Sequence, residues 1–168
     1  MIGKVIKYDK KDINTDLIIP ARYLTMIEPD YLAKHCMEDL DQDFLKKKDE
    51  FGYKIIVAGS NFGCGSSREQ APIALKAAGI NCIVAPSFAR IFYRNAINIG
   101  LPIIEFDNIE TINTDDELEI NFKEGIIKNI STKEKYQIKK IPSFLQEIIS
   151  ANGLINYARI KISKNLEK

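Results

Sequence analysis

The chain has 168 residues and contains no tryptophan, a single histidine and three cysteines. The histidine, His35, has no partner at a spacing typical of a metal site, so we expect it to be structural. Cys36, Cys64 and Cys82 are too widely spaced for a zinc motif or an obvious set of disulfides. We therefore expect no metal bound by this chain alone. The cysteine usage is typical of a reducing compartment, so we expect a cytoplasmic location.

The chain also has no excess charge and no long apolar run. Its 24 basic and 23 acidic residues give a formal net charge of +1. This balance offers no electrostatic basis for binding nucleic acid or a membrane surface. No apolar stretch approaches the ~18 residues needed to cross a bilayer, and the N-terminus lacks the apolar core of a signal peptide. We expect neither nucleic acid nor a membrane as a partner.

A glycine-rich stretch at residues 59–70 lies between an apolar run and a helical pattern. Three glycines within seven residues allow positive φ angles and a close approach of the backbone to a ligand. Ser66, Ser67 and Arg68 follow near the expected start of a helix, where unpaired N–H groups favour anions. The guanidinium fork matches a carboxylate or a phosphate. The stretch therefore predicts an anion-binding loop.

Nucleotide-binding motifs do not fit this loop. The phosphate loop requires Gly-x-x-x-x-Gly-Lys-Ser/Thr, but Gly59 and Gly65 are one residue too far apart and no lysine follows. In the dinucleotide fingerprint, Arg68 occupies the place of the third glycine, and no acid lies at residues 80–87. The nucleophile elbow Gly-x-Ser-x-Gly is absent as well. These mismatches favour a small carboxylate over a nucleotide.

Simpler interpretations of the same residues remain open. Ser66 with Glu69, or Ser67 with Gln70, matches a capping box that would only begin the following helix. Cys64 is either a reactive thiol or a small buried side chain. Asp16 lies in a polar turn, where it serves the turn itself or positions a hydroxyl or an arginine of a site.

The order of apolar patterns predicts an α/β fold. Buried strands at 54–58, 82–85 and 102–106 alternate with helices at 71–78 and 88–98, with Ser87 as a helix cap, which favours a parallel or mixed sheet flanked by helices. In the C-terminal third, residues 117–122 alternate with period two, and short strands follow at 126–131 and 136–141, which predicts a small antiparallel portion. We expect one domain over residues 1–168, with a tail at 154–168 that frays.

Three segments in this order resemble a known family: NTDLIIPARYL at residues 14–24, GSNFGCGSSRE at 59–69 and SFARIFYRN at 87–95. They are similar to the small subunits of 3-isopropylmalate dehydratase, which correspond to the mobile C-terminal domain of the aconitase superfamily. The resemblance runs from about residue 3 to residue 157. It implies a single swivelling β/β/α domain that works with a separate large subunit, and a [4Fe–4S] cluster carried by that large subunit. This chain itself would bind no cofactor.

The resemblance also implies a reaction and roles for individual residues. The reaction is a dehydration followed by a rehydration, which interconverts 2- and 3-isopropylmalate in leucine synthesis. Ser66 corresponds to the serine whose alkoxide removes the carbon-bound proton. Ser67 and Arg68 would hold a carboxylate of the dicarboxylate substrate, and Asp16 would support the site. The N–H groups of the loop at Gly63 and Gly65, together with nearby cations, would stabilise the serine anion.

The loop after Leu24 is the one that reads the substrate side group in this family. Met26 and Ile27 suit an isopropyl group, whereas relatives that accept an extra carboxylate tend to place an arginine there. The alternatives are a related hydro-lyase subunit acting on homoaconitate or on citraconate and 2-methylmalate, and a carboxylate- or phosphate-binding module without catalysis. We further expect the loop at 23–28 to be mobile in the isolated chain.

Overall fold

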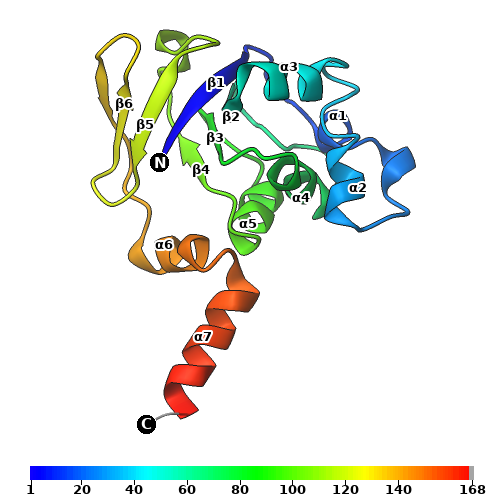
Figure 1. The fold of residues 1–168 in the computed structure, drawn as a ribbon, viewed down its shortest axis with the longest axis vertical. Coiled ribbons are helices and arrows are strands. Elements are labelled where there is room, and N and C mark those ends of the chain that lie inside the picture. Colours follow the sequence, from blue (N-terminus) through cyan, green and yellow to red (C-terminus); the bar gives the residue numbers. More distant parts are fainter. Residues whose placement is uncertain (167–168) are drawn as a thin grey trace.

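A seven-stranded mixed sheet forms the centre of the fold, with the strand order β4-β3-β2-β1-β5-β6-β7 (Figure 1). The computed structural model describes residues 1–166. β1 to β4 pair in parallel, whereas β5 to β7 continue from β1 as an antiparallel ladder. The predicted mixed sheet with a C-terminal antiparallel portion is confirmed. The strands are β1 (Ile2–Tyr8), β2 (Tyr53–Ala58), β3 (Cys82–Ala85), β4 (Ile103–Glu105), β5 (Glu117–Asn121), β6 (Ile126–Asn129) and β7 (Lys135–Gln137).

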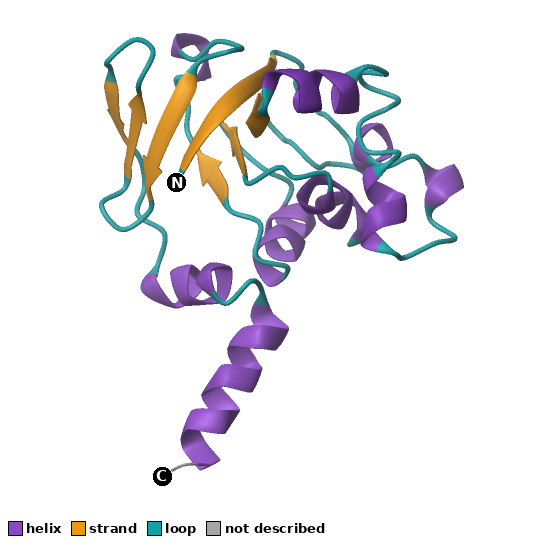
Figure 2. Ribbon diagram, in the orientation of Figure 1, coloured by secondary structure: helices purple, strands orange, loops and turns teal. Residues whose placement is uncertain are grey.

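Helices connect the parallel strands and lie mainly to one side of them (Figure 2). Several helices follow β1, and a single helix fills each of the crossovers between β2, β3 and β4. The helices are α1 (Thr15–Ile18), η1 (Ala21–Tyr23), α2 (Pro29–Ala33), α3 (Phe44–Phe51), α4 (Gln70–Ala77), α5 (Arg90–Asn98), η2 (Ile109–Thr111), α6 (Ser143–Ser150) and α7 (Leu154–Leu166).

Alternate side chains of the central strands enter two separate cores. In β2, Ile56 and Ala58 join the core under the helices, whereas Ile55 and Val57 join the second core. The second core is shared with residues of the antiparallel ladder, including Leu118. Because successive residues of a strand point to opposite faces, a strand buried on both sides must be apolar throughout. The sheet therefore curls until β5 to β7 cover the face that the helices leave open.

The start of α5 differs from the sequence-based expectation. We expected a helix from residue 88 capped by Ser87, but α5 begins at Arg90 with Ala89 as its N-cap. The hydroxyl oxygen of Ser87 instead accepts a hydrogen bond from the backbone N–H of Asn61 at 2.9 Å. Ser87 therefore joins two loops rather than ending one helix.

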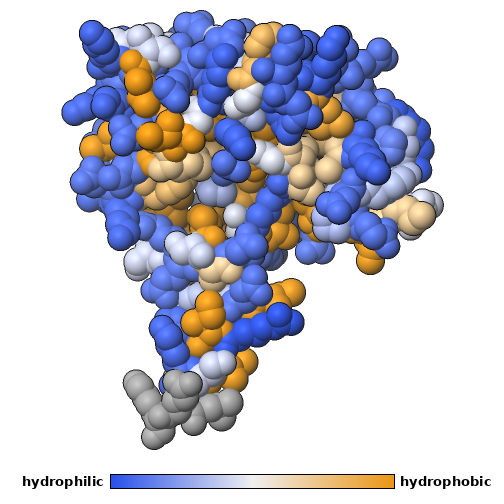
Figure 3. Space-filling view, in the orientation of Figure 1, coloured by the Kyte–Doolittle hydropathy of each residue, from blue (hydrophilic) through white to orange (hydrophobic). Residues whose placement is uncertain are grey.

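The C-terminal segment, for which we expected fraying, forms helix α7 as far as Leu166. Residues 167 and 168 of the same expectation lie outside the described part of the chain. α7 projects away from the sheet, and several of its apolar side chains face solvent, among them Ile155 and Ile162 (Figures 1 and 3). Between residues 1 and 166, no helix is long and apolar enough to cross a membrane.

Candidate functional site

The glycine-rich loop after β2 is bonded directly to the loop after β1. The N–H of Gly63 donates to the carbonyl of Ile13 at 2.8 Å, and the N–H of Thr15 donates to the carbonyl of Cys64 at 2.8 Å. The buried hydroxyl of Thr15 donates to the carbonyl of Ser66 at 2.9 Å. These bonds fix the backbone on both sides of Ser66. They also engage the N–H of Gly63, which removes it from the anion-stabilising role that we predicted for it.

Two glycines of this loop, Gly63 and Gly65, have positive φ. Gly63 has φ +76°, and a Cβ atom there would lie 2.2 Å from the ring of Phe92. Gly65 has φ +89°, and its N–H has no acceptor among residues 1–166. Positive φ is costly for residues with a Cβ, and the Phe92 ring leaves no room for one. The first glycine therefore allows close packing, and the second turns the backbone so that an N–H remains free.

The loop after β3 is attached to the same glycine-rich loop. Phe62 N–H donates to the carbonyl of Ser87 at 3.1 Å, and Ala89 N–H donates to the carbonyl of Phe62 at 3.0 Å. The rings of Phe62, Phe88 and Phe92 form a cluster, with 5.3 Å between the centroids of Phe62 and Phe92. This packing brings the first turn of α5 against the glycine loop.

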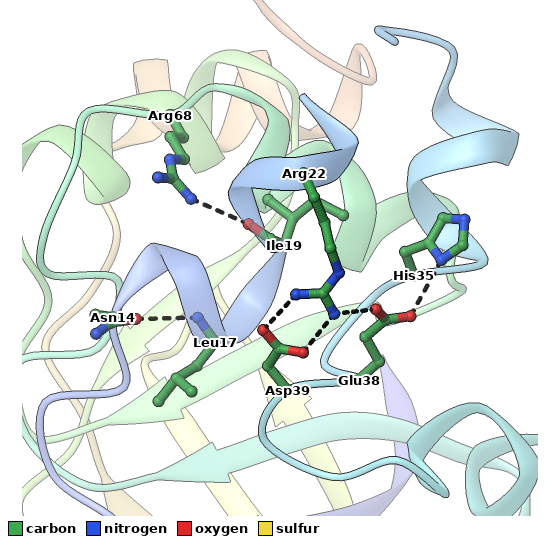
Figure 4. A network of polar contacts seen from close by, with 8 residues as sticks. All are labelled: Asn14, Leu17, Ile19, Arg22, His35, Glu38, Asp39 and Arg68. Atoms are coloured by element: carbon green, nitrogen blue, oxygen red, sulfur yellow. Dashed lines mark hydrogen bonds and ion pairs between the residues drawn. The ribbon is translucent and has the colours of Figure 1, made fainter. Parts of the chain in front are cut away.

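Arg68 is held by two partners from the loop after β1. Its Nη1 lies 2.6 Å from Oδ1 of Asp16. The same nitrogen donates to the carbonyl of Ile19 at 3.1 Å (Figure 4). Asn14, not Asp16, caps α1 through a bond from the N–H of Leu17. The carboxylate of Asp16 is therefore free for the arginine. Nε and Nη2 of Arg68 have no partner within the described residues, so one edge of the guanidinium is available to a ligand.

A pocket of about 280 Å³ opens between these loops. It is lined by Thr15, Gly63, Gly65, Ser66, Arg68 and the first turn of α5 at residues 89–92. The serines are not consumed by helix capping, because Glu69 is the N-cap of α4 and no side chain bonds to that end of the helix. Ser66 and Ser67 are exposed, and only Ser66 lines the pocket. The pocket thus combines a free hydroxyl, a fixed guanidinium and an unpaired backbone N–H.

Met26 and Ile27 lie outside this pocket. They are 48% and 71% exposed in the connection between η1 and α2. The base of the connection is fixed by the ring of Tyr23, which stacks on His35 with 3.7 Å between centroids. The guanidinium of Arg22 also lies over the Tyr23 ring, 4.8 Å from its centroid.

Arg22 is already engaged by acidic side chains. It makes a bidentate contact with Asp39, at 2.6 and 2.9 Å, and a further contact with Glu38, which also contacts His35 (Figure 4). The hydrogen bonds from Arg22 hold the pKa of the Asp39 carboxyl below its usual value. The arginine next to the connection is therefore neutralised and offers no free charge to a ligand.

The cysteines show little sign of nucleophilic or ligand chemistry. Burial raises the pKa values of the Cys36 and Cys82 thiols. Burial and the charge of Asp12 raise the pKa of the Cys64 thiol, so the thiol form predominates at neutral pH. Among residues 1–166, no three His, Cys, Asp or Glu side chains gather at a distance suited to a metal ion. The described side chains thus do not fit an iron–sulfur cluster.

Comparisons with known proteins agree on one family. The Aconitase C-terminal domain family matches residues 2–109. The 3-isopropylmalate dehydratase small subunit of Ruminiclostridium cellulolyticum is 55% identical over 162 residues, covering 96% of this chain and 98% of that protein. The corresponding small subunit of Clostridium botulinum is 56% identical over 160 residues, covering 95% and 98%. This chain belongs to the family of 3-isopropylmalate dehydratase small subunits.

A solved structure extends the agreement to three dimensions. The crystal structure of 3-isopropylmalate dehydratase from Methanocaldococcus jannaschii matches with a TM-score of 0.87 and 42% identity, over 100% of both chains. The predicted resemblance and fold are therefore confirmed. The small-subunit name of the family implies a large-subunit partner.

Two residues of this family member's pocket had no role in the sequence-based site. The hydroxyl of Thr15 donates to the carbonyl of Ser66, 51 residues away. Arg90 lines the pocket with Ser66 and Arg68. Neither contact has a local sequence signal, because both depend on how three loops meet at one edge of the sheet.

Proposed function

We propose that this chain works with a large subunit as a 3-isopropylmalate dehydratase, interconverting 2- and 3-isopropylmalate in leucine biosynthesis in the cytoplasm. The observation that carries the proposal is the pocket in which the exposed hydroxyl of Ser66 lies beside the fixed guanidinium of Arg68. Family membership supplies the reaction, a dehydration followed by a rehydration. The geometry of the pocket supports the roles that we propose for individual residues of this chain.

Ser66 is the proposed base that removes the carbon-bound proton. A serine hydroxyl is a weak base, so its anion needs stabilisation from nearby positive groups. The free N–H of Gly65 and the guanidinium groups of Arg68 and Arg90 lie around the same pocket. Thr15 holds the main chain of Ser66 in place, so the hydroxyl does not depend on a flexible loop for its position.

Arg68 and Ser67 are the proposed partners of one substrate carboxylate. Nη1 of Arg68 is occupied by Asp16 and Ile19, so the carboxylate would approach the other edge through Nε and Nη2. Asp16 thereby fixes the orientation of the Arg68 guanidinium. A residue that contacts a ligand-binding side chain, rather than the ligand itself, often has this role. Arginine suits this task because its planar donors match both oxygens of a carboxylate.

Met26 and Ile27 are the proposed contacts of the isopropyl group once the large subunit closes the site. Both are exposed and apolar, and their burial against the substrate would be favourable. The nearby Arg22 is neutralised by Asp39 and Glu38, so it offers no free cation to an additional carboxylate. This arrangement favours isopropylmalate over homoaconitate.

The large subunit is the proposed source of the [4Fe–4S] cluster, which would supply Lewis-acid chemistry at the substrate hydroxyl. The described side chains of this chain do not gather into a metal-binding set. The pocket of Ser66 should accordingly face the large subunit, because the proton-removing group and the cluster must reach the same small dicarboxylate.

Anaerobic reconstitution with the large subunit of the same organism tests this function. The absorbance of the unsaturated product would be followed with isopropylmalate, citrate, homoaconitate and citramalate. We expect turnover of isopropylmalate and a loss of about 100-fold or more in kcat for Ser66→Ala. The matched control is Ser163→Ala, since Ser163 lies on the projecting helix α7.

Other outcomes would overturn parts of the proposal. Turnover of another acid of the panel would retain the dehydratase reaction but refute the assignment of Met26 and Ile27. Full activity of Ser66→Ala would refute the role of Ser66 as the base. A complex with an intact cluster that turns over none of the acids would favour the non-catalytic binding module.

A further inference from the structure

Residues 24–28, which connect η1 to α2, are flanked by side chains that contact one another. Before the connection, the ring of Tyr23 stacks on His35 with 3.7 Å between centroids. The same ring lies edge-on to Tyr31, with 6.2 Å between centroids. Tyr31 and His35 both follow the connection in the chain. The three rings therefore close the base of the connection, whereas the apolar side chains within it are exposed.

Arg22 makes a second link across the same base. Its Nη2 donates to Oδ1 of Asp39 at 2.6 Å and to Oε1 of Glu38 at 2.5 Å. Its Nη1 donates to Oδ2 of Asp39 at 2.9 Å (Figure 4). Oε2 of Glu38 lies in turn 3.1 Å from Nδ1 of His35. These four side chains form one network, which joins η1 to the turn that follows α2.

A contribution to stability does not account for this network. The side chains of Arg22 and Asp39 are 53% and 39% exposed, and exposed ion pairs contribute little to stability. A bidentate contact nevertheless fixes geometry, because two parallel donors restrict how the guanidinium turns relative to the carboxylate. The main effect of the network is therefore to hold η1 in one orientation.

The segment that Arg22 holds also reaches Arg68. The carbonyl of Ile19 accepts a hydrogen bond from Nη1 of Arg68 at 3.1 Å, and η1 begins two residues later. One end of this segment is thus bonded to the guanidinium that we propose for a substrate carboxylate, and the other end to the Arg22 network. The segment between them sets the distance from the bound carboxylate to Met26 and Ile27.

We infer that Arg22 is a positioning residue for recognition of the substrate side group. It holds the connection at 24–28 so that the apolar side chains there meet the isopropyl group while Arg68 binds a carboxylate. This inference rests on the proposed function and adds to it a residue that does not touch the substrate. Because Ser66 and Arg68 belong to another loop, loss of Arg22 should weaken binding of the isopropyl group and leave proton removal unchanged.

Two competing explanations are that Arg22 only supports the fold and that it contacts the large subunit. Lys128→Gln is the matched control, because Lys128 is 43% exposed and pairs with Glu119 at 3.6 Å. Lys128 belongs to β6, and the antiparallel ladder lies on the opposite side of the molecule from α2 (Figure 1). This variant also removes an exposed, paired cation, but at a distance from the connection.

The test compares two probes that differ only in the isopropyl group, 2-isopropylsuccinate and succinate. Calorimetry measures their affinity for the complex with the large subunit, at concentrations where sedimentation shows the complex to be fully formed. Arg22→Gln should weaken binding of 2-isopropylsuccinate about 5- to 10-fold, and binding of succinate by less than about 2-fold. Lys128→Gln should leave both affinities within about 2-fold of the wild type.

Steady-state kinetics provide a second measurement. In Arg22→Gln, the KM for isopropylmalate should rise about 5- to 10-fold, whereas kcat should stay within about 2-fold of the wild type. This pattern is expected when an interaction is lost that is equally strong in the ground state and in the transition state.

Two further variants test the contact itself. Arg22→Lys keeps the charge but cannot make the bidentate contact, so it should recover only part of the preference for 2-isopropylsuccinate. Asp39→Asn should reproduce the effect of Arg22→Gln. The double variant should be no more severe than either single variant, because both substitutions break the same contact.

Several results would overturn the inference. Equal weakening of both probes in Arg22→Gln would show general damage to the site rather than a lost position of the connection. A variant that binds the large subunit less tightly, while its fully formed complex keeps the wild-type preference, would assign Arg22 to the subunit interface. Additive effects of Arg22→Gln and Asp39→Asn would show that the two residues do not act together.

The same measurements distinguish failure of the inference from failure of the proposed function. A wild-type complex that prefers 2-isopropylsuccinate but does not turn over isopropylmalate would refute the function, and the two probes would still decide the role of Arg22. A wild-type complex without this preference would refute the proposed contacts of Met26 and Ile27 together with the inference. An active wild-type complex whose preference is unchanged in Arg22→Gln would refute the inference alone.

Discussion

Nη1 of Arg68 lies 2.6 Å from Oδ1 of Asp16, although 52 residues separate them in the chain. The arginine side chain is only 11% exposed, whereas the aspartate is 50% exposed. An arginine at the start of a helix is unfavourable for the helix dipole, so it needs an acidic partner. Asp16 provides that partner from another loop, and the pair links the loop after β1 to the loop after β2.

The first prediction concerns this pair. Asp16→Asn keeps the size of the side chain but removes the charge that compensates Arg68. We expect a loss of about 1 kcal/mol in the free energy of unfolding, because a largely buried charge loses its partner while staying partly solvated. The KM for isopropylmalate should rise about 10-fold, since the guanidinium is no longer held in one orientation.

Urea unfolding of the isolated chain and steady-state kinetics of the complex measure both effects. Asp9→Asn is the matched control, because Asp9 is 83% exposed and pairs with Lys7 outside the site. An Asp16→Asn variant that resembles this control in both measurements would contradict the supporting role of Asp16.

The second prediction separates backbone strain from crowding. Gly63 and Gly52 have nearly the same φ, +76° and +73°, but a Cβ at Gly63 would meet Phe92 at 2.2 Å, whereas a Cβ at Gly52 would meet nothing within 4 Å. Gly52→Ala should cost about 1 kcal/mol through the left-handed backbone alone. Gly63→Ala should cost about 3 kcal/mol or more, because the ring of Phe92 must also move.

Chemical denaturation measures the free energy of unfolding of Gly52→Ala and of Gly63→Ala. A loss of activity in Gly63→Ala that exceeds its loss of folded protein would indicate that the shape of the pocket changed as well. Equal destabilisation of the two variants would contradict the crowding argument.

The sequence predicted the parallel strands β2 to β4 well because their signals are local, whereas β7 covers residues 135–137 rather than the predicted 136–141. Apolar runs such as residues 54–58 coincide with β2, and Gly79 follows α4 with φ +89°, as a helix-ending glycine does. The fold class and the family resemblance predicted from the motifs were confirmed as well. These features depend on neighbouring residues, which a linear sequence displays directly.

Contacts between loops were beyond local patterns. Ser87 has the chemistry of a helix cap, yet its oxygen accepts the N–H of Asn61 from another loop. Thr15 looked like turn chemistry, yet it bonds to the carbonyl of Ser66. The Lys-rich composition of residues 154–168 predicts a frayed tail, whereas residues 154–166 form helix α7. For Ser87 and Thr15, the hydrogen-bond partner comes from a distant part of the chain. For α7, helix propensity is sufficient to form a helix that buries little apolar surface.

The third prediction concerns the choice of substrate. Ile27→Arg places a free cation in the connection after η1, where the existing Arg22 is neutralised by Asp39 and Glu38. The kcat/KM for isopropylmalate should fall about 10-fold, because the isopropyl group loses an apolar contact. Relative turnover of homoaconitate should rise, since its additional carboxylate gains a partner.

Steady-state kinetics of the reconstituted complex with isopropylmalate and with homoaconitate give the ratio of the two kcat/KM values. Ile162→Arg is the control, because Ile162 is 60% exposed on α7. An unchanged substrate ratio in Ile27→Arg would contradict the role of this connection in reading the side group.

The fourth prediction concerns stability in acid. Asp41 accepts hydrogen bonds from Nζ of Lys47 at 2.8 Å and from the hydroxyl of Tyr8 at 3.0 Å. Burial opposes the charged form, but these bonds prevail and hold the pKa of Asp41 below 3.8. A carboxyl whose pKa is lower in the folded state stabilises the protein above its unfolded pKa. That contribution disappears as the pH falls through the folded pKa.

We therefore expect the free energy of unfolding to decrease as the pH falls below about 4. Asp41→Asn should be less stable than the wild type at pH 7, because Lys47 and Tyr8 lose a charged partner, but its stability should depend less on pH in this acidic range. Urea unfolding between about pH 7 and pH 3 measures the slope for each protein. Asp107→Asn removes an exposed carboxylate and serves as the control. An Asp41→Asn slope equal to that of the wild type would show that other carboxylates, such as Asp39 beside Arg22, govern acid sensitivity.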